Sequence, residues 1–439
     1  MKSYDAAVIG GGVLGCFALR SLCRYRLSAV LIEAQADVCM GITRANSAIV
    51  YAGYDNKPGS LKARMCVRAN RNFHELCSEL DVPFSRCGSL MTSCGEKGNA
   101  VLEKKYRDGI ANGLEGLELI SGDKARELEP LLSKDVQSAL YAPMTGTVNP
   151  WRLGIAACEN AVHNGAELRL NTKLLAIEKT EGSYVLRTNA GDIFCKAVIN
   201  CAGLSAHVVQ RMVYLCAVSI EKDATDFLVM DRDIEKPSRI IFQEKEDGKG
   251  ITAVPCTEGN LLVDSAPRAM TRLFATSAEG IESIKKQLTA LLPELERDII
   301  RAFAALRPNP HSEDGRSIND FCIETPAPGF VSLIGIKTPG LTCAEELGRY
   351  AAGICAEYLQ APPNPAFDGR RKAINCADDD IVCLCEGISR AEIVESIRRG
   401  ARTVEAVKRR VGTGMGRCQG SRCEIKIAQI LEKYANGTL

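Results

Sequence analysis

The sequence lacks three features that would place it in a common functional class. It has almost no net charge (+1), so bulk electrostatics predict neither a nucleic-acid partner nor strong attraction to an anionic membrane. It has no apolar run near the roughly 18 residues that a membrane helix requires, so we expect no transmembrane segment. Its N-terminus leads at once into a strand-like segment, so we do not expect a secretory signal.

The sequence also lacks a disulfide framework, although it contains 20 cysteines. Most are scattered, and several lie inside apolar runs, where a free thiol behaves as a small hydrophobic side chain; examples are Cys16, Cys201 and Cys355. This usage indicates a reducing compartment, and we therefore expect a cytoplasmic protein. A chain of 439 residues is long enough for two or three domains.

The most specific pattern occupies the first 33 residues. An apolar run at residues 5–9 leads into a G-x-G-x-x-G motif (Gly10, Gly12, Gly15), a helical pattern follows, and a second apolar run ends at Glu33. This order is typical of a βαβ dinucleotide-binding unit, in which the glycines allow a tight turn, a close approach to pyrophosphate and close helix packing. The carboxylate at the end of the second strand is suited to bind a ribose hydroxyl.

Later segments return to this unit after excursions, which predicts a second domain inserted in pieces. Residues 215–270 alternate strand-like segments with turns and indicate an antiparallel sheet. A proline-rich stretch beginning at Ala361 is typical of a linker. We predict a nucleotide-binding domain (1–80, 149–210, 322–360), a substrate domain (81–148, 211–321), a linker (361–375) and a small all-α C-terminal module (376–439).

Several helices are expected from apolar spacing and capping residues. A capping box from Thr276 to Glu279 predicts a helix to residue 292, and another from Ser389 to Glu392 predicts a helix in the C-terminal module. Residues 100–130 are predicted to be charged and helical. Further helices are expected at residues 153–164, 344–358, 403–410 and 424–434.

Four cysteines near the C-terminus are spaced like metal ligands: Cys383, Cys385, Cys418 and Cys423. Four thiolates suit either zinc or an iron–sulfur cluster, and spacing alone does not separate the two. Four arginines lie near the second pair, where they would offset the negative charge of a cluster or form a solvated basic face; they are Arg409, Arg410, Arg417 and Arg422.

The C-terminal module resembles the bacterioferritin-associated-ferredoxin-like (BFD-like) [2Fe–2S] domain. The resemblance is carried by Cys383-x-Cys385 and by the block from Gly414 to Cys423. The second pair is spaced C-x-x-x-x-C, as in modules fused to flavin dehydrogenases. The resemblance implies a [2Fe–2S] cluster as the cofactor of this module.

Residues 1 to about 360 resemble the D-amino-acid-oxidase-like FAD oxidoreductases, closest to the L-2-hydroxyglutarate and anaerobic glycerol-3-phosphate dehydrogenase branches. The resembling stretches are residues 46–53, 57–63, 146–150, 200–203 and 335–342. The resemblance implies an α/β, Rossmann-like FAD-binding domain with an inserted antiparallel substrate domain. It implies that FAD is contacted by Gly10, Gly12, Gly15, Glu33, Thr43, Asn46, Ser47, Gly203, Gly335, Gly340, Leu341 and Thr342.

The sequence departs from these branches in the expected substrate domain. Tyr51 replaces a histidine near the flavin, and residues 224–227 and 308–319 differ from the sequence pattern of these branches. Among the candidate catalytic residues, Arg307 has the planar fork that suits a carboxylate or phosphate, and His311 and Tyr51 are candidate proton acceptors. We expect Lys62 on a helix surface and Trp151 in the core.

We therefore predict an FAD-dependent dehydrogenase that oxidises a small anionic hydroxy compound, glycerol 3-phosphate or a 2-hydroxy acid. Hydride transfers to FAD, and electrons leave through the [2Fe–2S] cluster to a partner. The alternative is an electron-transfer subunit whose substrate site lies in another chain; a regulator without catalysis is the weakest interpretation. The resemblance implies a complex with a second flavoprotein and a small cysteine-rich subunit.

Overall fold

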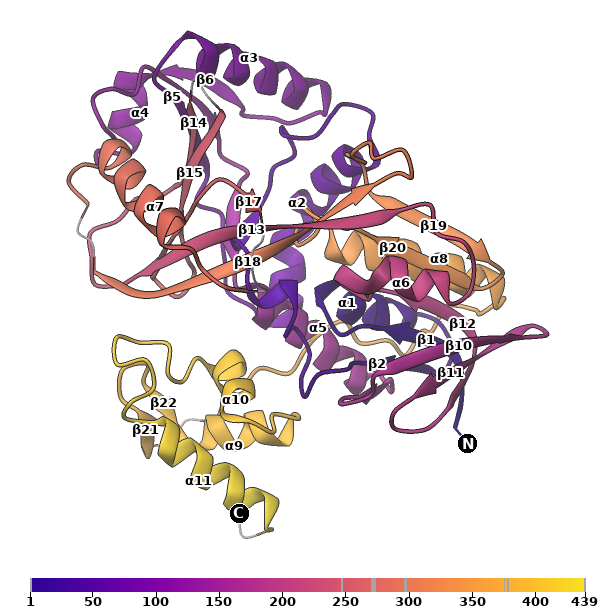
Figure 1. Cartoon of the computed structure of the whole chain (residues 1–439). Coiled ribbons are helices and arrows are strands. Elements are labelled where there is room, and N and C mark those ends of the chain that lie inside the picture. The colour runs from indigo at the N-terminus through magenta and orange to yellow at the C-terminus, as the bar shows by residue number, and fades with distance from the viewer. Residues whose placement is uncertain are drawn as a thin grey trace.

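The computed structural model describes residues 2–245, 248–269, 274–295, 298–374, 376 and 379–437. The last residue of the expected linker, 375, lies outside them. The described chain forms two large sheets and a small helical module at its C-terminal end. Figure 1 shows this module in yellow, beside helix α5 (Pro150–His163) and below the ends of strands β13 (Ser219–Met230) and β18 (Ile299–His311).

The first sheet has eight strands and a parallel centre. β1 (Ser3–Ile9) lies between β2 (Ala29–Ile32) and β12 (Ile193–Asn200), parallel to both, and their apolar side chains are almost fully buried. The remaining strands are β9 (Glu167–Arg169), β10 (Leu174–Thr180), β11 (Ser183–Thr188), β19 (Cys322–Ala327) and β20 (Phe330–Ile334). β9 and β20 are parallel to their neighbours β2 and β12, whereas β10, β11 and β19 are antiparallel additions.

One face of this sheet is covered by three helices. α1 (Val13–Leu22) packs between α5 and α8 (Ala344–Tyr358). α5 begins where the sequence provides both a cap and a helix starter, because the Asn149 side chain accepts the N–H of Arg152 and Pro150 occupies the first helical position. The side chains on the other face of the central strands lie in a second buried apolar cluster, so the parallel strands are buried on both faces.

The second sheet has nine strands in the order β17-β13-β16-β15-β14-β5-β7-β6, with β18 also paired to β13. The strands not yet located are β5 (Ser89–Ser93), β6 (Glu118–Ser121), β7 (Ser138–Ala142), β14 (Ile240–Lys245), β15 (Gly248–Pro255), β16 (Leu261–Asp264) and β17 (Arg268–Ala269). β13 and β18 form a long antiparallel ladder from Ser219–His311 to Met230–Ile299. We call the part of the chain built on this sheet the substrate domain; the boundaries stated above remain a prediction.

Three helices pack on the second sheet: α3 (Glu96–Ala111), α4 (Gly122–Leu128) and α7 (Ala278–Leu291). Between the two sheets run the long α2 (Leu61–Leu80) and a small sheet of β3 (Ile49–Val50), β4 (Phe84–Ser85) and β8 (Gly146–Val148). The remaining short elements are η1 (Ile42–Arg44), η2 (Gly203–Ser205) and α6 (Ala206–Arg211).

The C-terminal module contains α9 (Arg390–Arg398), α10 (Val404–Val411) and α11 (Glu424–Ala435). They enclose their own apolar core, which includes Ile393, Ile397, Val407 and Ile427. A two-stranded pairing of β21 (Ile381–Cys383) with β22 (Ile388–Ser389) adds to the helices that the sequence predicts.

Two local predictions are wrong. The segment 100–130 is not continuously helical, because β6 joins β7 between α3 and α4. The predicted cap at Thr276 is displaced by one residue: Ser277 caps α7 by accepting the N–H of Gly280, and its hydroxyl is held by the Asp226 carboxylate at 3.0 Å. The capping box at Ser389 and Glu392 is confirmed.

Candidate active site and cluster site

Four predicted cofactor residues lie at one edge of the first sheet. Gly10, Glu33 and Gly335 directly follow β1, β2 and β20, and Gly203 follows β12 after two residues. These strands are parallel, so their carboxyl ends share one edge, which is where open α/β sheets bind ligands.

The glycine turn has the geometry that a dinucleotide requires. Gly10 has a φ of +99°, and a Cβ at Gly15 would lie 1.9 Å from the Gly10 carbonyl oxygen, so neither position accepts a side chain. A Cβ at Gly12 would meet only Thr43 Oγ1, at 3.4 Å, among the protein atoms around it. The backbone at Gly12 is therefore open to a pyrophosphate, and the turn fits the FAD that the sequence implies.

Glu33 lies across this turn. One carboxylate oxygen accepts the N–H of Gly11 at 2.6 Å and the other accepts the N–H of Gln35 at 2.8 Å. The adjacent loop closes over the start of α1, where Thr43 Oγ1 accepts the N–H of Val13 at 3.0 Å. Asn46 shapes that loop through its amide, which donates to the Thr43 carbonyl at 2.8 Å.

Tyr51 links this loop to the segment that follows β20. Its N–H donates to Thr342 Oγ1 at 3.0 Å, and its side chain interacts with that of Ser47. Burial raises the pKa of the Tyr51 phenol, so the hydroxyl stays protonated and available as a hydrogen-bond donor. The structure thus brings Ser47, Tyr51 and Thr342 together, with Leu341 and Gly340 immediately before Thr342.

Beside Tyr51, three cationic side chains converge. The pKa values of Lys62 and Lys337 are both lowered, first by burial and then by neighbouring cations, and that of Lys62 falls to about 8. Arg307 contributes to both effects. Within the described residues, no ion pair to a carboxylate within 4.0 Å is formed by any of the three.

The acidic groups closest to these cations are engaged elsewhere. Asp320 accepts the N–H groups of Leu61 and Lys62 at 2.8 and 2.9 Å, and Asp223 accepts the Asn309 amide at 2.6 Å. Among the residues that the structure describes, the Lys337 ammonium donates only to the neutral Asn309 side chain, at 3.2 Å. The cluster of Lys62, Arg307 and Lys337, which we call the cationic cluster, is therefore suited to bind an anionic ligand.

The prediction that Lys62 lies on a helix surface is wrong. Its residue is only 7% exposed, and its ammonium lies 5.5 Å from the centre of the Phe321 ring. Asp320 accepts the backbone N–H groups of the first turn of α2, where Lys62 lies. Trp151 is partly buried against a core cluster, in keeping with the expectation for it.

His311 lies on the same face of β18 as Arg307 and Asn309, because these residues are spaced by two in one strand. Its Nδ1 is 3.1 Å from the Asn309 carbonyl oxygen, and its Nε2 is 3.6 Å from the exposed Glu221 carboxylate. His311 therefore lies at the outer end of the strand that carries Arg307.

The four ligand-spaced cysteines meet in two pairs. The sulfurs of Cys385 and Cys418 are 3.4 Å apart, and the buried thiols of Cys383 and Cys423 interact with each other. Among the described residues, no three acidic, histidine or cysteine side chains are arranged for a single metal ion. Two thiol pairs suit a [2Fe–2S] cluster, since each of its two irons takes two protein ligands.

The loops that carry these pairs pass close to each other. A Cβ at Gly416 would lie 2.7 Å from Cys385 Cβ, so glycine is required where the second loop crosses the first.

All twenty cysteines are free thiols. No described helix has the length and apolar character needed to cross a membrane.

The expected role of two arginines is wrong. Arg409 and Arg410 neither face the cysteines nor form a solvated surface, because both are buried in ion pairs with Asp37. Arg417 instead pairs with Asp231 and Asp298. The sequence contained no local signal for the partner at Asp37, which lies more than 370 residues away along the chain.

Comparison with known proteins gives two family matches. Residues 5–354 match the family described as FAD dependent oxidoreductase, and residues 381–433 match the BFD-like [2Fe-2S] binding domain. A glycerol 3-phosphate dehydrogenase from Caloramator mitchellensis is 37% identical over 98% of this chain and 94% of its own. The human mitochondrial L-2-hydroxyglutarate dehydrogenase is 27% identical over 48% of each chain.

The fold also matches solved structures. The dithionite-reduced L-alpha-glycerophosphate oxidase of Mycoplasma pneumoniae, with FAD bound, superposes with a TM-score of 0.77 and 23% identity. The match covers 85% of this chain and 99% of that one, so the part without a counterpart corresponds in size to the C-terminal module.

Proposed function

The chain belongs to the FAD dependent oxidoreductase family, and on this premise we propose that it is a glycerol 3-phosphate dehydrogenase. It is an FAD-dependent oxidoreductase with a BFD-like [2Fe–2S] domain. The proposed reaction oxidises the secondary alcohol of glycerol 3-phosphate to the ketone, and the electrons leave through the cluster.

The observation that carries this proposal is the cationic cluster of Lys62, Arg307 and Lys337. A phosphate dianion would give Lys62, Arg307 and Lys337 the direct ion pair that none of them forms among the described residues. The guanidinium of Arg307 matches two phosphate oxygens with two parallel N–H groups, and the two lysines add charge without a fixed geometry. The 37% identical protein from Caloramator mitchellensis is named a glycerol 3-phosphate dehydrogenase. This name supports a substrate that carries a phosphate over a 2-hydroxy acid that carries a second carboxylate.

Bound FAD supplies the hydride acceptor. For its binding, the open backbone at Gly12 would approach the pyrophosphate and Glu33 would receive the ribose hydroxyls. Thr43, Asn46, Ser47, Gly203, Gly335, Gly340, Leu341 and Thr342 complete the proposed cofactor contacts.

The proposed catalytic residues have different roles at the substrate. Arg307 holds the phosphate, and Tyr51 donates a hydrogen bond to the reacting hydroxyl, because its raised pKa keeps the phenol protonated. His311 is kept as the proposed acceptor of the hydroxyl proton, although it lies four residues beyond Arg307, at the outer end of β18.

The acceptor of the electrons is proposed to be a separate protein, and a complex with a second flavoprotein and a small cysteine-rich subunit is its proposed form. A cluster that takes one electron at a time has a use only where electrons are passed on. Free thiols at all twenty cysteines support a reducing, cytoplasmic location.

The deciding experiment is anaerobic absorbance of the purified holoenzyme as glycerol 3-phosphate, L-2-hydroxyglutarate and proline are added separately. Bleaching of the flavin by glycerol 3-phosphate, lost in Arg307→Gln and retained in the control Arg316→Gln, is the expected result. Arg316 is an exposed residue of the same region, paired only with Asp314. Bleaching by dithionite but by none of the three compounds would overturn the proposal and favour an electron-transfer subunit.

A further inference from the structure

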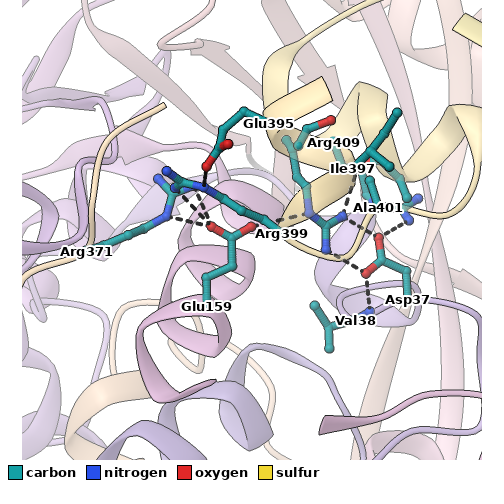
Figure 2. Close-up of polar contacts among 12 residues, drawn as sticks. Asp37, Val38, Glu159, Arg371, Glu395, Ile397, Arg399, Ala401 and Arg409 are labelled. Carbon is teal, nitrogen blue, oxygen red and sulfur yellow. Dashed lines mark hydrogen bonds and ion pairs between the residues drawn. The ribbon is translucent and has the colours of Figure 1, made fainter. Parts of the chain in front are cut away.

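The C-terminal module is joined to the nucleotide-binding domain by a buried carboxylate. Asp37 is 1% exposed; one oxygen accepts Arg409 Nη2 and Arg410 Nη1, both at 2.8 Å, and the other accepts Arg410 Nη2 at 3.0 Å. Figure 2 shows Arg409 reaching from the module to Asp37, which belongs to the loop after β2. Burial opposes ionisation of Asp37, yet the guanidinium groups of Arg410 and Arg409 hold its pKa below the usual value.

A second carboxylate, Glu159 on α5, collects three further contacts. It pairs with Arg371 at 2.8 Å, with Arg399 at 3.6 Å and with Arg410 Nε at 3.3 Å. These arginines come from the linker, the end of α9 and α10, so three segments meet at one side chain (Figure 2). Asp37 and Glu159, with these four arginines, form what we call the ionic clamp.

The clamp differs from the many ion pairs on the surface. Exposed pairs contribute little to stability because water and salt screen them. In contrast, removing one partner of a buried pair leaves an uncompensated charge out of water. In the ionic clamp, the side chains of Arg409 and Arg410 are 7% and 3% exposed. Separating the module from the nucleotide-binding domain would therefore break several buried ion pairs together.

A separate set of contacts holds the cysteine loops against the substrate domain. Arg232, just after β13, donates to the Cys385 carbonyl oxygen and pairs with Glu386 at 3.2 Å. Arg417, next to Cys418, pairs with Asp298 at 3.2 Å and lies 3.6 Å from Asp231. Both loops that present the cluster ligands therefore contact the same end of the β13–β18 ladder.

We propose that Asp37 and Glu159 are positioning residues that lock the [2Fe–2S] module in one orientation on the rest of the enzyme. The module then works as a fixed electron exit and does not swing on its linker between donor and acceptor. The linker alone would allow swinging, but the module is contacted from the nucleotide-binding domain, from α5 and from the substrate domain. This proposal concerns the module's placement and holds whether or not glycerol 3-phosphate is the substrate.

The test compares holoenzyme variants Asp37→Asn and Glu159→Gln with wild type and with Asp314→Asn, which removes an exposed pair. Small-angle scattering reports the maximum dimension of the particle, and limited trypsin digestion reports cleavage after residues 370–372. Opening of the clamp should increase the maximum dimension of the particle. It should also raise the cleavage rate at least about tenfold, because local opening then costs less free energy. Wild type and Asp314→Asn should remain compact and resistant.

Two further readouts separate positioning from general damage. Iron content and the cluster's midpoint potential should stay at wild-type values in Asp37→Asn, because its carboxylate does not contact the cysteines. Flavin bleaching by substrate should also be unchanged while electron delivery to a one-electron acceptor slows, and Asp37→Glu should recover part of that rate.

The proposal is overturned if the wild-type holoenzyme already scatters as an extended particle, or if its linker is cleaved as fast as that of Asp37→Asn. If Asp37→Asn does not fold, Glu159→Gln carries the same comparison from α5. Failure of every candidate substrate to bleach the flavin would overturn the proposed function alone, since the scattering and cleavage results stand without turnover.

Discussion

Asp320 accepts the backbone N–H groups of Leu61 and Lys62 at 2.8 and 2.9 Å, at the start of the helix whose Lys62 side chain contributes to the cationic cluster. The same carboxylate offers Lys62 too little compensation for its charge. Burial and the neighbouring Lys337 and Arg307 outweigh it and lower the pKa of Lys62 to about 8. A buried lysine that loses its proton near physiological pH gives the proposed substrate site a measurable pH dependence.

We expect the KM for glycerol 3-phosphate to rise as the pH passes through about 8, where free Lys62 loses its proton. The sign follows from charge: the protonated ammonium attracts phosphate, and the neutral amine does not. Lys62→Arg should move the rise to higher pH, because a guanidinium stays protonated. Initial rates across neutral and mildly alkaline pH measure this, with the exposed Lys57→Arg as control. A KM profile that is the same in wild type and Lys62→Arg would contradict the assignment.

A second prediction concerns stability and the divergent segment at residues 224–227. Asp226 is fully buried, and it accepts Arg268 Nε and Nη2 at 2.7 and 2.8 Å as well as the Ser277 hydroxyl. Asp226→Asn should lower the free energy of unfolding by about 3 kcal/mol, because Arg268 loses its charged partner. Urea unfolding of the holoenzyme measures the change.

The control for this prediction is Glu178→Gln, which removes a partner of Arg187 on the surface. It should lower the free energy of unfolding far less than Asp226→Asn does, because water and salt screen exposed pairs. Burial opposes ionisation of Asp226, but Arg268 and Ser277 hold its pKa below the usual value. Its stabilising effect is therefore present above the unfolded-state pKa and is lost as the pH falls through the lower native pKa. Equal effects of Asp226→Asn and Glu178→Gln would refute the prediction.

The parts of the molecule that sequence patterns predicted share one property: their determinants are close together in the chain. The turn from Gly10 to Gly15, the capping box at Ser389 and helix α8 each depend on residues within one or two turns of each other. The meeting of the four ligand-spaced cysteines was also expected, because two short spacings and a glycine-rich block identify them together.

The features that were missed depend on contacts distant in sequence. The backbone N–H of Lys62 is bound by Asp320, and the partner of Arg409 and Arg410 is Asp37. Helical spacing placed Lys62 at the surface, and for the arginines the sequence offered either a role beside the cluster or a solvated basic face. Neither pattern contains the distant carboxylate. A buried charge needs a partner, but sequence alone does not say which one.

Cluster binding is predicted to depend on both thiol pairs and to be separable from FAD binding. Cys385→Ser or Cys418→Ser removes one sulfur of the 3.4 Å pair, so the purified protein should lose most of its iron and its cluster absorbance. FAD content should stay near wild type, because the contacts that Cys385 makes are with Cys418 and Arg232 and not with the nucleotide turn. The control is Cys94→Ser, an exposed free thiol, which should keep both cofactors. Iron retained at wild-type level in Cys385→Ser would contradict this ligand assignment.

FAD binding is predicted to fail when a single methyl group is added at Gly15. Its Cβ would lie 1.9 Å from the Gly10 carbonyl oxygen, so Gly15→Ala must push α1 away from the turn that faces the pyrophosphate. Gly353→Ala is the matched control, since that glycine lies in α8 and its nearest neighbour to a Cβ is Tyr25 Oη at 4.0 Å. Flavin absorbance per polypeptide measures the result. Because alanine favours helix over glycine, Gly353→Ala should bind FAD fully, whereas full FAD content in Gly15→Ala would show that the turn is not the dinucleotide site.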